Sequence, residues 1–405
     1  MKNKKKDLYI INTNYPYGKT ETFLENEVVF LAPYFNKIYL FPLNYPSKDF
    51  FVREVPPNVV YKSASLDKKH YKRILKFLFK RSPSKNHIFD LVNLFKSDKG
   101  HYGSKLKRWF FSFLIDRAFY KSKHFKFIKN NIKPNDILYF YWGGSKSIYA
   151  SRFNHPNTFI RIHGGEINFE RNRGYIPLFN KLFKSNATYL AISEKVRETI
   201  IKYNKGINVV VNRLGTYDYG LGPINEKKST ICIVSCSNVI PLKRVHLILE
   251  ALDQIKDINV EWVHFGDGPL LKEIKIKAKK LSSNITPIFK GRVLNQTVLN
   301  FYKKNSVDAF INVSTTEGVP VSIMEALSFG IPCFATDVGA TAEIVNNKNG
   351  KIVPKEFDSK EIVKFIYKIK TSNYIQKRSK ARETWELDYN ANKNYKKLIE
   401  LFYST

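Results

Sequence analysis

Residues 314–332 read STTEGVPVSIMEALSFGIP and carry the signals that begin and end one short helix. Pro320 suits a first helical position, because a helix leaves its first backbone amides unpaired and proline has none to lose. Gly330 suits the position just past a helix, where the chain often turns left-handed. The stretch therefore predicts a loop that carries Glu317, followed by a short helix that carries Glu325.

The first turn of this helix is expected to bind an anion. Its leading amides, around Val319 to Ser322, have no acceptors within the helix, and the helix dipole adds positive charge at the same end. This end suits a diphosphate. Glu317 on the loop can accept hydrogen bonds from sugar hydroxyls, and Glu325 on the helix can accept them from ribose hydroxyls. The alternative is an ordinary capped helix with two surface glutamates, and the placed glycines and proline favour binding.

Apolar, strand-like runs alternate with helical runs on both sides of this stretch. Strands separated by helices are typical of parallel, doubly wound sheets, whose ligands bind at the carboxyl ends of the strands. The second half is expected to form strands at Thr230–Ser235, Val260–Phe265, Ile288–Phe289, Val307–Val313 and Cys333–Thr336, with helices at Arg244–Gln254, Leu270–Lys280 and Pro320–Phe329. The first half is expected to form strands at Leu8–Asn12, Ile38–Phe41, Asp136–Tyr141, Thr158–Ile162, Ala187–Ile192 and Asn208–Val211, with a helix at Phe23–Phe30.

The length of 405 residues favours two domains over one. Gly220, Gly222 and Pro223 lie among polar residues and mark a linker. We therefore expect an α/β protein of two Rossmann-like, doubly wound parallel-sheet domains. The predicted parts are an N-terminal domain over residues 1–218 with a basic helical insert over 61–130, a C-terminal domain over 219–385, and a helix within 386–405 that packs back on the N-terminal domain.

The formal charge of +33 makes nucleic acid, an anionic membrane surface and anionic substrates candidate partners. Residues 61–130 hold 19 Lys or Arg against 4 Asp, whereas residues 231–355 hold 15 Lys or Arg against 11 Asp or Glu. The basic excess therefore lies in the N-terminal half. No zinc-ligand spacing or nucleic-acid fingerprint accompanies it, so nucleic acid is not an expected partner.

Cysteine use and hydropathy favour a reduced, cytoplasmic protein. The 3 cysteines form no regular framework of the kind that secreted domains carry. The charged N-terminus runs straight into an apolar stretch that is too short for a signal sequence, and no segment approaches the ~18 apolar residues that a spanning helix needs. Attachment to the inner face of the cell membrane stays open, because two basic segments have apolar helical faces: Tyr71, Ile74, Leu75 and Leu78, and Leu106, Trp109, Phe110, Phe113 and Leu114. The alternative is that these faces pack on the N-terminal sheet.

Against this background, EGVPVSIMEALSFGIP at residues 317–332 resembles the glutamate-pair motif of the retaining glycosyltransferases of family 4, the group 1 glycosyl transferases, which adopt the two-domain GT-B fold. Other segments resemble the family in the same order along the chain: SCSNVIPLKR at 235–244, FGDGPL at 265–270, KGRV at 290–293, ATDVGATAEIV at 335–345, and Asn349-Gly350. The resemblance covers nearly the whole C-terminal half. It implies two domains that face each other across a cleft.

The resemblance also implies roles for single residues. Glu325 would bind the nucleotide ribose, Glu317 would contact the donor sugar, and Lys243 would neutralise the diphosphate. The backbone around Gly318, Val319, Pro320 and Val321 would hold the phosphates, and that near Arg292 and Val293 would hold the base. The family usually has an arginine five positions before the lysine, and this chain has Asn238 there. Arg244 would compensate for that arginine or simply face solvent.

Two N-terminal segments resemble the family as well. RIHGGE at 161–166 resembles a loop in which a His-Gly pair lies beside the donor sugar, which gives His163 a catalytic role. A structural histidine is the alternative, and Arg161 would be paired in the core or would reach a phosphate. YPYGKTETF at 15–23 resembles the loop near the donor phosphates, where Gly18 would let backbone amides approach an anion. Thr20 is alternatively a plain helix cap.

Together these features predict a retaining, metal-independent glycosyltransferase that uses a nucleotide-diphosphate sugar, with UDP-sugar favoured, and no other cofactor. The chain contains no Asp-x-Asp motif of the kind that holds a metal in the other common architecture. The expected acceptor is a saccharide, linked to a lipid, in bacterial surface polysaccharide synthesis. The alternatives are a nucleotide-sugar epimerase, a glycogen-type synthase, or a binding relative without activity.

Overall fold

The computed structural model describes residues 5–44, 51–63, 85–96, 102–120, 122–144, 147–224, 229–369 and 374–404. The chain divides into two compact units: Met1–Asn212 with Tyr395–Thr405, and Arg213–Asn394. In the described part of the chain, no helix combines the length and the apolar character that crossing a membrane requires.

The N-terminal unit is built on a 7-stranded sheet in the order β3-β2-β1-β4-β5-β6-β7. All its strands pair in parallel. The strands are β1 (Leu8–Asn12), β2 (Ile38–Pro42), β3 (Val59–Tyr61), β4 (Ile137–Phe140), β5 (Thr158–Ile162), β6 (Thr188–Ala191) and β7 (Val209–Val211). The helices are α1 (Thr22–Leu31), α3 (Lys85–Lys96), α4 (Tyr102–Tyr120), α5 (Lys123–Asn131), α6 (Ala150–Phe153), α7 (Phe179–Leu182), α8 (Glu194–Tyr203) and α15 (Ala391–Tyr403), which begins in the other unit.

Alternation along the strands divides this core into two layers. Leu8 and Ile10 of β1 join the cluster formed by α1 and the last turns of α15. Tyr9 points to the opposite face, where it stacks on Tyr39, and Tyr39 in turn contacts Phe127 of α5. Because successive side chains of a strand point to opposite faces, β1, whose five residues are all buried, is covered on both faces.

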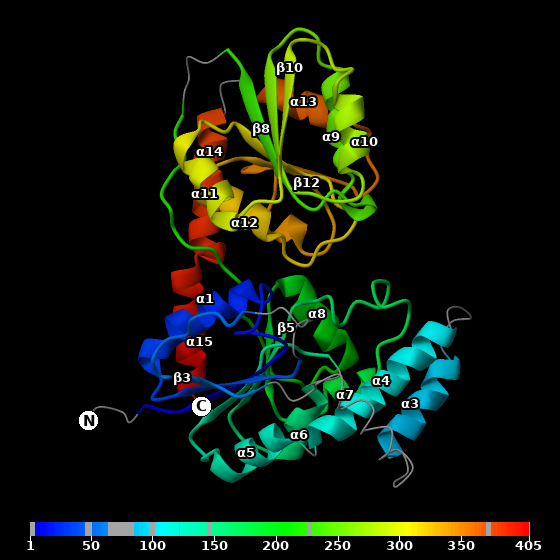
Figure 1. Ribbon diagram of the computed structural model, residues 1–405, viewed down its shortest axis with the longest axis vertical. Helices are drawn as coiled ribbons and strands as arrows, with labels where there is room; N and C mark the ends of the chain where they lie inside the picture. The colour runs from blue at the N-terminus through cyan, green and yellow to red at the C-terminus, as the bar shows by residue number, and fades with distance from the viewer. Residues whose placement is uncertain are drawn as a thin grey trace. The chain divides into compact units, whose positions relative to one another are not determined.

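The C-terminal unit is built on a 6-stranded parallel sheet in the order β10-β9-β8-β11-β12-β13. The strands are β8 (Ile231–Cys236), β9 (Val260–Phe265), β10 (Ile285–Gly291), β11 (Ala309–Asn312), β12 (Cys333–Thr336) and β13 (Gly350–Val353). Figure 1 shows α9 (Val245–Asp253), α10 (Leu271–Ala278) and α13 (Lys360–Lys368) on one face, and α11 (Asn295–Lys304), α12 (Val321–Ser328) and α14 (Tyr374–Thr384) on the other.

The predicted fold class, two Rossmann-like parallel sheets, is confirmed. Some bounds differ for physical reasons. β10 is longer than the predicted Ile288–Phe289 and includes Pro287, which the edge of a sheet tolerates because an edge strand leaves some amides unpaired. β3 and β13 are short edge strands that the sequence did not indicate.

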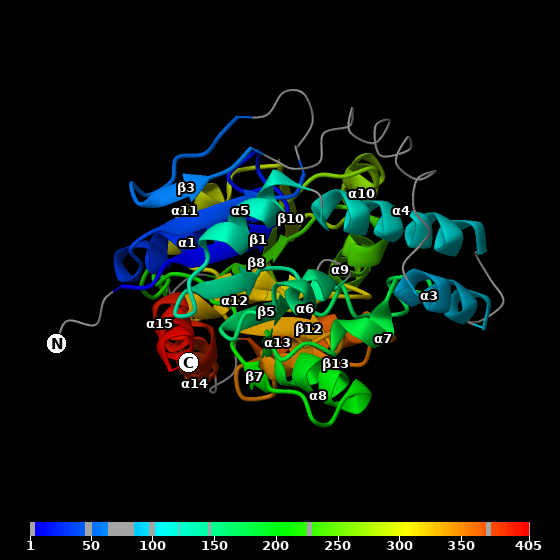
Figure 2. The ribbon, with the colours of Figure 1, turned by 90° about the horizontal axis from the view of Figure 1, so that it is seen from below.

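From residue 85 onward, the described parts of the basic insert are mainly helical, in α3, α4 and α5, whereas Tyr61 belongs to β3. In the two ribbon views, α3 and α4 lie side by side (Figure 2). The predicted apolar face of Tyr71, Ile74, Leu75 and Leu78 lies outside the described residues. On α4, Phe113 and Leu114 are buried, as the packing interpretation expects, whereas Leu106 is 45 % exposed.

Candidate functional site

The strand order of the C-terminal sheet creates one switch point, between β8 and β11. From β8 the chain winds outward through β9 and β10, and from β11 it winds the other way through β12 and β13. The loops after two such strands diverge and leave a crevice where ligands of doubly wound sheets bind. Lys243 follows β8 and Glu317 follows β11, so the fold brings these two predicted residues to the same crevice.

Lys243 and Glu317 form an ion pair across this switch point. The Lys243 Nζ donates to Glu317 Oε1 at 2.5 Å, and the Asn312 side-chain amide donates to the same oxygen at 3.2 Å. The cavity between the strand ends measures only about 10 Å³, with Lys243 and Asn312 in its lining. Glu317 therefore already accepts one of the three N–H donors of the Lys243 ammonium group.

The Glu317 loop is fixed by a close backbone approach. Gly339 has φ +60°, and a Cβ at this position would lie 2.0 Å from the Glu317 carbonyl oxygen. The neighbouring Ala340 amide donates to the Gly318 carbonyl at 3.0 Å. Only glycine fits here, because it tolerates both the left-handed backbone and the contact. The loop after β12 thereby holds Glu317 and Gly318 in place.

The start of α12 lies directly after this loop. α12 begins at Val321, one residue later than predicted, and Pro320 is its N-cap residue. The Pro320 carbonyl accepts from the amides of Ile323 and Met324. Val319 and Pro320 are buried, whereas Gly318, Val321 and Ser322 are partly accessible. The leading amides of a helix have no acceptor within it, so the geometry leaves this end suited to an anion.

Glu325 points from the middle of α12 into a buried environment. It is 7 % exposed, and its Oε1 accepts from the Asn295 side-chain amide at 2.8 Å. Burial raises the pKa of Glu325 to about 7, and the Asn295 hydrogen bond offsets part of that rise. Asn295, at the start of α11, is a site residue that sequence reasoning missed.

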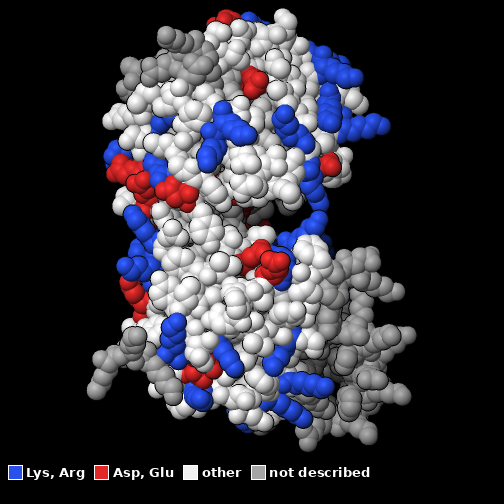
Figure 3. All heavy atoms as spheres, turned by 60° about the vertical axis from the view of Figure 1, so that its left-hand side comes forward, with Lys and Arg blue, Asp and Glu red and all other residues white. Residues whose placement is uncertain are grey.

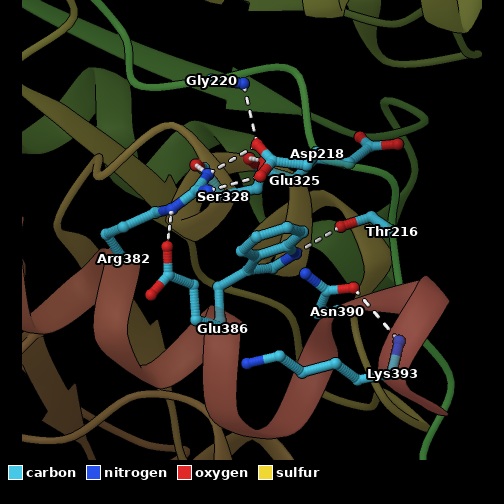
Figure 4. A network of polar contacts seen from close by, with 10 residues as sticks. Thr216, Asp218, Gly220, Glu325, Ser328, Arg382, Glu386, Asn390 and Lys393 are labelled. Atoms are coloured by element: carbon cyan, nitrogen blue, oxygen red, sulfur yellow. Dashed lines mark hydrogen bonds and ion pairs between the residues drawn. The ribbon is translucent and has the colours of Figure 1, made fainter.

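The far end of α12 is clamped by Arg378 and Arg382 of α14, and Figure 4 shows the contacts of Arg382. Arg382 donates to the Ser328 carbonyl at 2.5 Å and binds both oxygens of Asp218 at 2.9 and 2.6 Å. Arg378 donates to the Phe329 and Gly222 carbonyls. Positive charge at a helix C-terminus is favourable, so this clamp fixes α12 and the segment around Asp218 while the other end of the helix stays available.

The remaining predicted donor residues lie at different places. Asn238 is exposed on the loop after β8, and Arg292 and Val293 lie on the turn between β10 and α11. The Arg244 guanidinium donates to the carbonyls of Val313 and Lys355 at 2.8 and 2.7 Å. Arg244 thus ties two loops together and does not simply face solvent, whereas its compensation for the arginine missing at position 238 stays a prediction.

In the N-terminal unit, His163 follows β5 and lies against Trp142, which follows β4. The two ring centroids are 4.1 Å apart. Glu166 accepts from the His163 amide at 2.9 Å, and its carboxylate lies 3.5 Å from Nδ1. Burial alone would raise the pKa of Glu166, but these contacts with His163 lower it below its usual value.

The prediction that amides around Gly18 approach an external anion does not fit the structure. The Gly18 amide donates to the Phe51 carbonyl at 2.9 Å. The amides of Thr13, Asn14 and Tyr15 instead bind a carboxylate of the chain itself, that of Glu21. Glu21 is also the N-cap residue of α1, so Thr20 is not the cap.

Arg161 is paired in the core. It is fully buried, and its guanidinium lies 3.2 Å from Glu27 and donates to the Asn212 side chain at 2.8 Å. Burial raises the pKa of Glu27, and the charge of Arg161 opposes that rise. Among the residues that the structure describes, no three His, Cys, Asp or Glu side chains gather closely enough to hold a metal ion.

Solved structures share this architecture over almost the entire chain. The apo form of the lipopolysaccharide outer core galactosyltransferase WaaB matches with a TM-score of 0.66 and 16 % identity, covering 98 % of this chain and 99 % of that one. HepE of Anabaena in complex with UDP matches with a TM-score of 0.64 and 14 % identity, covering 99 % and 100 %. The two sheets together therefore form the GT-B fold.

Sequence comparison adds one match to a family of sequences. Residues 222–386 match the family model described as glycosyl transferases group 1. CapJ of Staphylococcus aureus is 27 % identical over 221 residues, which cover 51 % of this chain and 50 % of CapJ. The chain thus spans about half the length of the curated relatives that it matches.

Proposed function

We propose that the protein is a glycosyltransferase that moves a sugar from a nucleotide-diphosphate sugar to a saccharide acceptor in bacterial surface polysaccharide synthesis. One observation carries the proposal: Lys243 and Glu317 meet at the switch point of the C-terminal sheet, directly before the open end of α12. The family match and the lipopolysaccharide galactosyltransferase among the similar folds support the same class.

Each of three parts of the donor, namely the diphosphate, the ribose and the sugar, has its own binding residues. The diphosphate lies against the leading amides of α12 and Lys243, which stabilise the negative charge that develops as the sugar–phosphate bond breaks. Glu325, oriented by Asn295, accepts from the ribose hydroxyls. Glu317, released from Lys243, accepts from the donor sugar. The solved HepE complex holds UDP, which supports a UDP-sugar as the donor.

Metal independence and retention are further parts of the proposal. Lys243 and the helix amides supply the positive charge that a metal would otherwise provide, so transfer is expected to continue in excess chelator. Loss of activity that magnesium restores would refute metal independence. Retention rests on the family resemblance, with His163 beside the donor sugar. Retention is tested by the anomeric configuration of the product, measured by NMR at early time points.

A lipid-linked acceptor would bring the protein to a membrane, and α3 offers a surface for it. His87, Asp90 and Leu94 are buried on one side of this helix. The other side exposes four apolar residues at helical spacing, Ile88 at 50 %, Phe89 at 67 %, Val92 at 49 % and Phe95 at 61 %. On the face in Figure 3, Lys and Arg side chains are scattered over both units rather than gathered in one patch. The exposed apolar stripe of α3 is the observation that supports attachment.

Vesicle co-sedimentation tests this attachment. Wild-type protein is expected to pellet with anionic vesicles, and the double variant Phe89→Ser, Phe95→Ser is expected to stay in solution. Val29→Ser, which alters an exposed apolar residue on α1, is the matched control. Equal pelleting of all three proteins would remove the α3 stripe from the proposal.

The function itself is tested by thermal-shift screening against nucleotide sugars, followed by a transfer assay with the donor that binds. A ligand of the folded state raises its melting temperature. Lys243→Ala and Glu325→Ala are expected to lose the shift and the transfer. Wild-type behaviour in both variants would contradict the proposal. Epimerisation of the donor, or elongation of a soluble glucan, would favour the alternative enzymes of the same fold.

A further inference from the structure

The N-terminal sheet also has a switch point, between β1 and β4, and a side chain of the protein fills it. The Glu21 carboxylate accepts five hydrogen bonds there. Three come from consecutive backbone amides, those of Thr13 at 2.9 Å, Asn14 at 2.6 Å and Tyr15 at 2.7 Å. The other two come from the side chains of Asn12 at 3.1 Å and Trp142 at 2.5 Å. Successive amides that converge in this way form an anion-binding nest, and here the anion is built in.

Glu21 is held in an unusual backbone conformation to reach this place. Its φ of 58° and ψ of 41° lie in the left-handed region, which residues with a Cβ rarely adopt. Such a conformation persists only where the surroundings enforce it, and it gathers at functional sites. The hydrogen bonds to the carboxylate are the contacts that enforce it.

Trp142 connects this carboxylate to His163. The indole Nε1 donates to Glu21 Oε1, and the face of the same indole lies against the His163 imidazole at 36° between the ring planes. Two other residues contact the histidine: Glu166 accepts from its backbone amide, and the ring of Tyr141 lies 5.0 Å from the imidazole. The hydrogen bond to Glu21 therefore holds the Trp142 indole in place, and the indole in turn packs against one face of the His163 imidazole.

We propose that Glu21 is a positioning residue, which sets the orientation of His163 through Trp142. The same hydrogen bonds lead us to propose that the loop after β1 does not bind the donor diphosphate, because the Glu21 carboxylate already occupies its nest of amides. The inference rests on the proposed function, in which His163 lies beside the donor sugar. It assigns phosphate binding to the C-terminal unit and orientation of the reacting group to the N-terminal one.

The test combines a spectroscopic and a kinetic readout on the full chain. With histidine labelled at the ring carbon Cε1, the resonance of His163 is identified by its absence in His163→Gln. The ring current of Trp142 displaces this resonance in the wild type. In Glu21→Gln, which turns a donor toward the amides of the nest, the resonance is expected to move toward the position of a free histidine. Glu25→Gln is the matched control, because this nearby acid pairs with Arg53 instead.

In the transfer assay, Glu21→Gln is expected to lower kcat about tenfold or more, because a small misplacement of a reacting group is costly. The KM for the nucleotide sugar is expected to stay within about twofold, since Glu21 does not bind the donor. Glu25→Gln is expected to leave both constants at wild-type values. If Glu21→Gln does not fold, Trp142→Phe carries the kinetic readout, because it keeps Glu21 and its backbone hydrogen bonds. Its NMR spectrum is not used for this comparison, since the loss of the indole ring current moves the His163 resonance by itself.

An unmoved His163 resonance, or an unchanged kcat despite a moved resonance, overturns the inference. A rise in the donor KM with kcat preserved overturns it as well, since that result would place Glu21 in donor binding. A wild-type chain that transfers no sugar overturns the proposed function and the kinetic part of this inference. The NMR comparison then decides alone whether Glu21 orients the two rings.

Discussion

Glu325 lies where a carboxylate is costly to ionise, and this cost couples donor binding to pH. Burial raises the pKa of Glu325 from 4.5 to about 7. A raised pKa means that the folded chain holds this proton more tightly than the unfolded chain. The free energy of unfolding of the free protein therefore falls as pH rises between those two values. In the proposed site, ribose hydroxyls donate to the ionised form of Glu325, so donor binding is expected to rise with pH over the same range.

We predict that affinity for the nucleotide sugar rises about tenfold between pH 6 and pH 8, as the ionised fraction of a group with a pKa near 7 does. Glu325→Gln should bind weakly and without this dependence. Calorimetric titration should use the intact nucleotide sugar, because the terminal phosphate of a free nucleoside diphosphate itself titrates near pH 6. A wild-type affinity that is flat across this range would show that Glu325 does not bind in its ionised form.

At the scale of elements, a close contact between two loops at Gly339 fixes the position of Glu317. Gly339 lets the loop after β12 press against the Glu317 carbonyl. Gly220 has a similar left-handed backbone, with φ +85°, but a Cβ there meets nothing within 4 Å. An alanine at either position would pay the cost of a left-handed backbone, but only at position 339 would its Cβ also clash with another loop.

We predict that Gly339→Ala lowers donor affinity by about tenfold or more, because the loop must shift before the added methyl group fits. Gly220→Ala should lose only about 1 kcal/mol of stability, the cost of a left-handed alanine, and should keep the wild-type affinity. Thermal unfolding and donor titration of the two variants check this difference. Equal effects on affinity would show that the close approach is unimportant.

The sequence predicted strands well where a run of mostly β-branched, aromatic and other apolar residues was bounded by turn residues. β1, β5, β9 and β12 have the predicted bounds, although Arg161 interrupts the run in β5 and Glu261 and His264 interrupt it in β9. Contacts between distant segments left no such signal. Asn295 lies 30 positions from Glu325, and Trp142 lies 121 positions from Glu21. Glu21 was missed because a glycine loop after a first strand suggests an external anion, and only the folded backbone shows that the chain supplies its own.

At the scale of the molecule, each unit has its own core, and the end of the chain completes the first. Leu398, Ile399 and Phe402 of α15 belong to the cluster beneath β1 and α1. Phe402 is fully buried, with ring contacts to Phe159 at 4.8 Å and Tyr139 at 5.4 Å. The fold of the N-terminal unit thus depends on residues that follow the C-terminal unit in the sequence.

We predict that Phe402→Ala destabilises the N-terminal unit by about 3–5 kcal/mol, the usual cost of emptying a buried phenylalanine site. Lys397→Ala, an exposed change on the same helix, should be near neutral. Calorimetry with and without nucleotide sugar distinguishes the units, because the donor raises the transition of the C-terminal one. Loss of that donor response in Phe402→Ala would contradict the proposed assignment of nucleotide binding to the C-terminal unit.

A crystal structure with a bound UDP-sugar tests the central claim most directly. The account predicts the diphosphate at the start of α12, within hydrogen-bond distance of the amides between Val319 and Ser322. It also predicts that Lys243 has left Glu317 for a phosphate oxygen and that the ribose hydroxyls lie on Glu325. A nucleotide bound elsewhere, or bound with the Lys243–Glu317 pair intact and these amides without a phosphate, would contradict it.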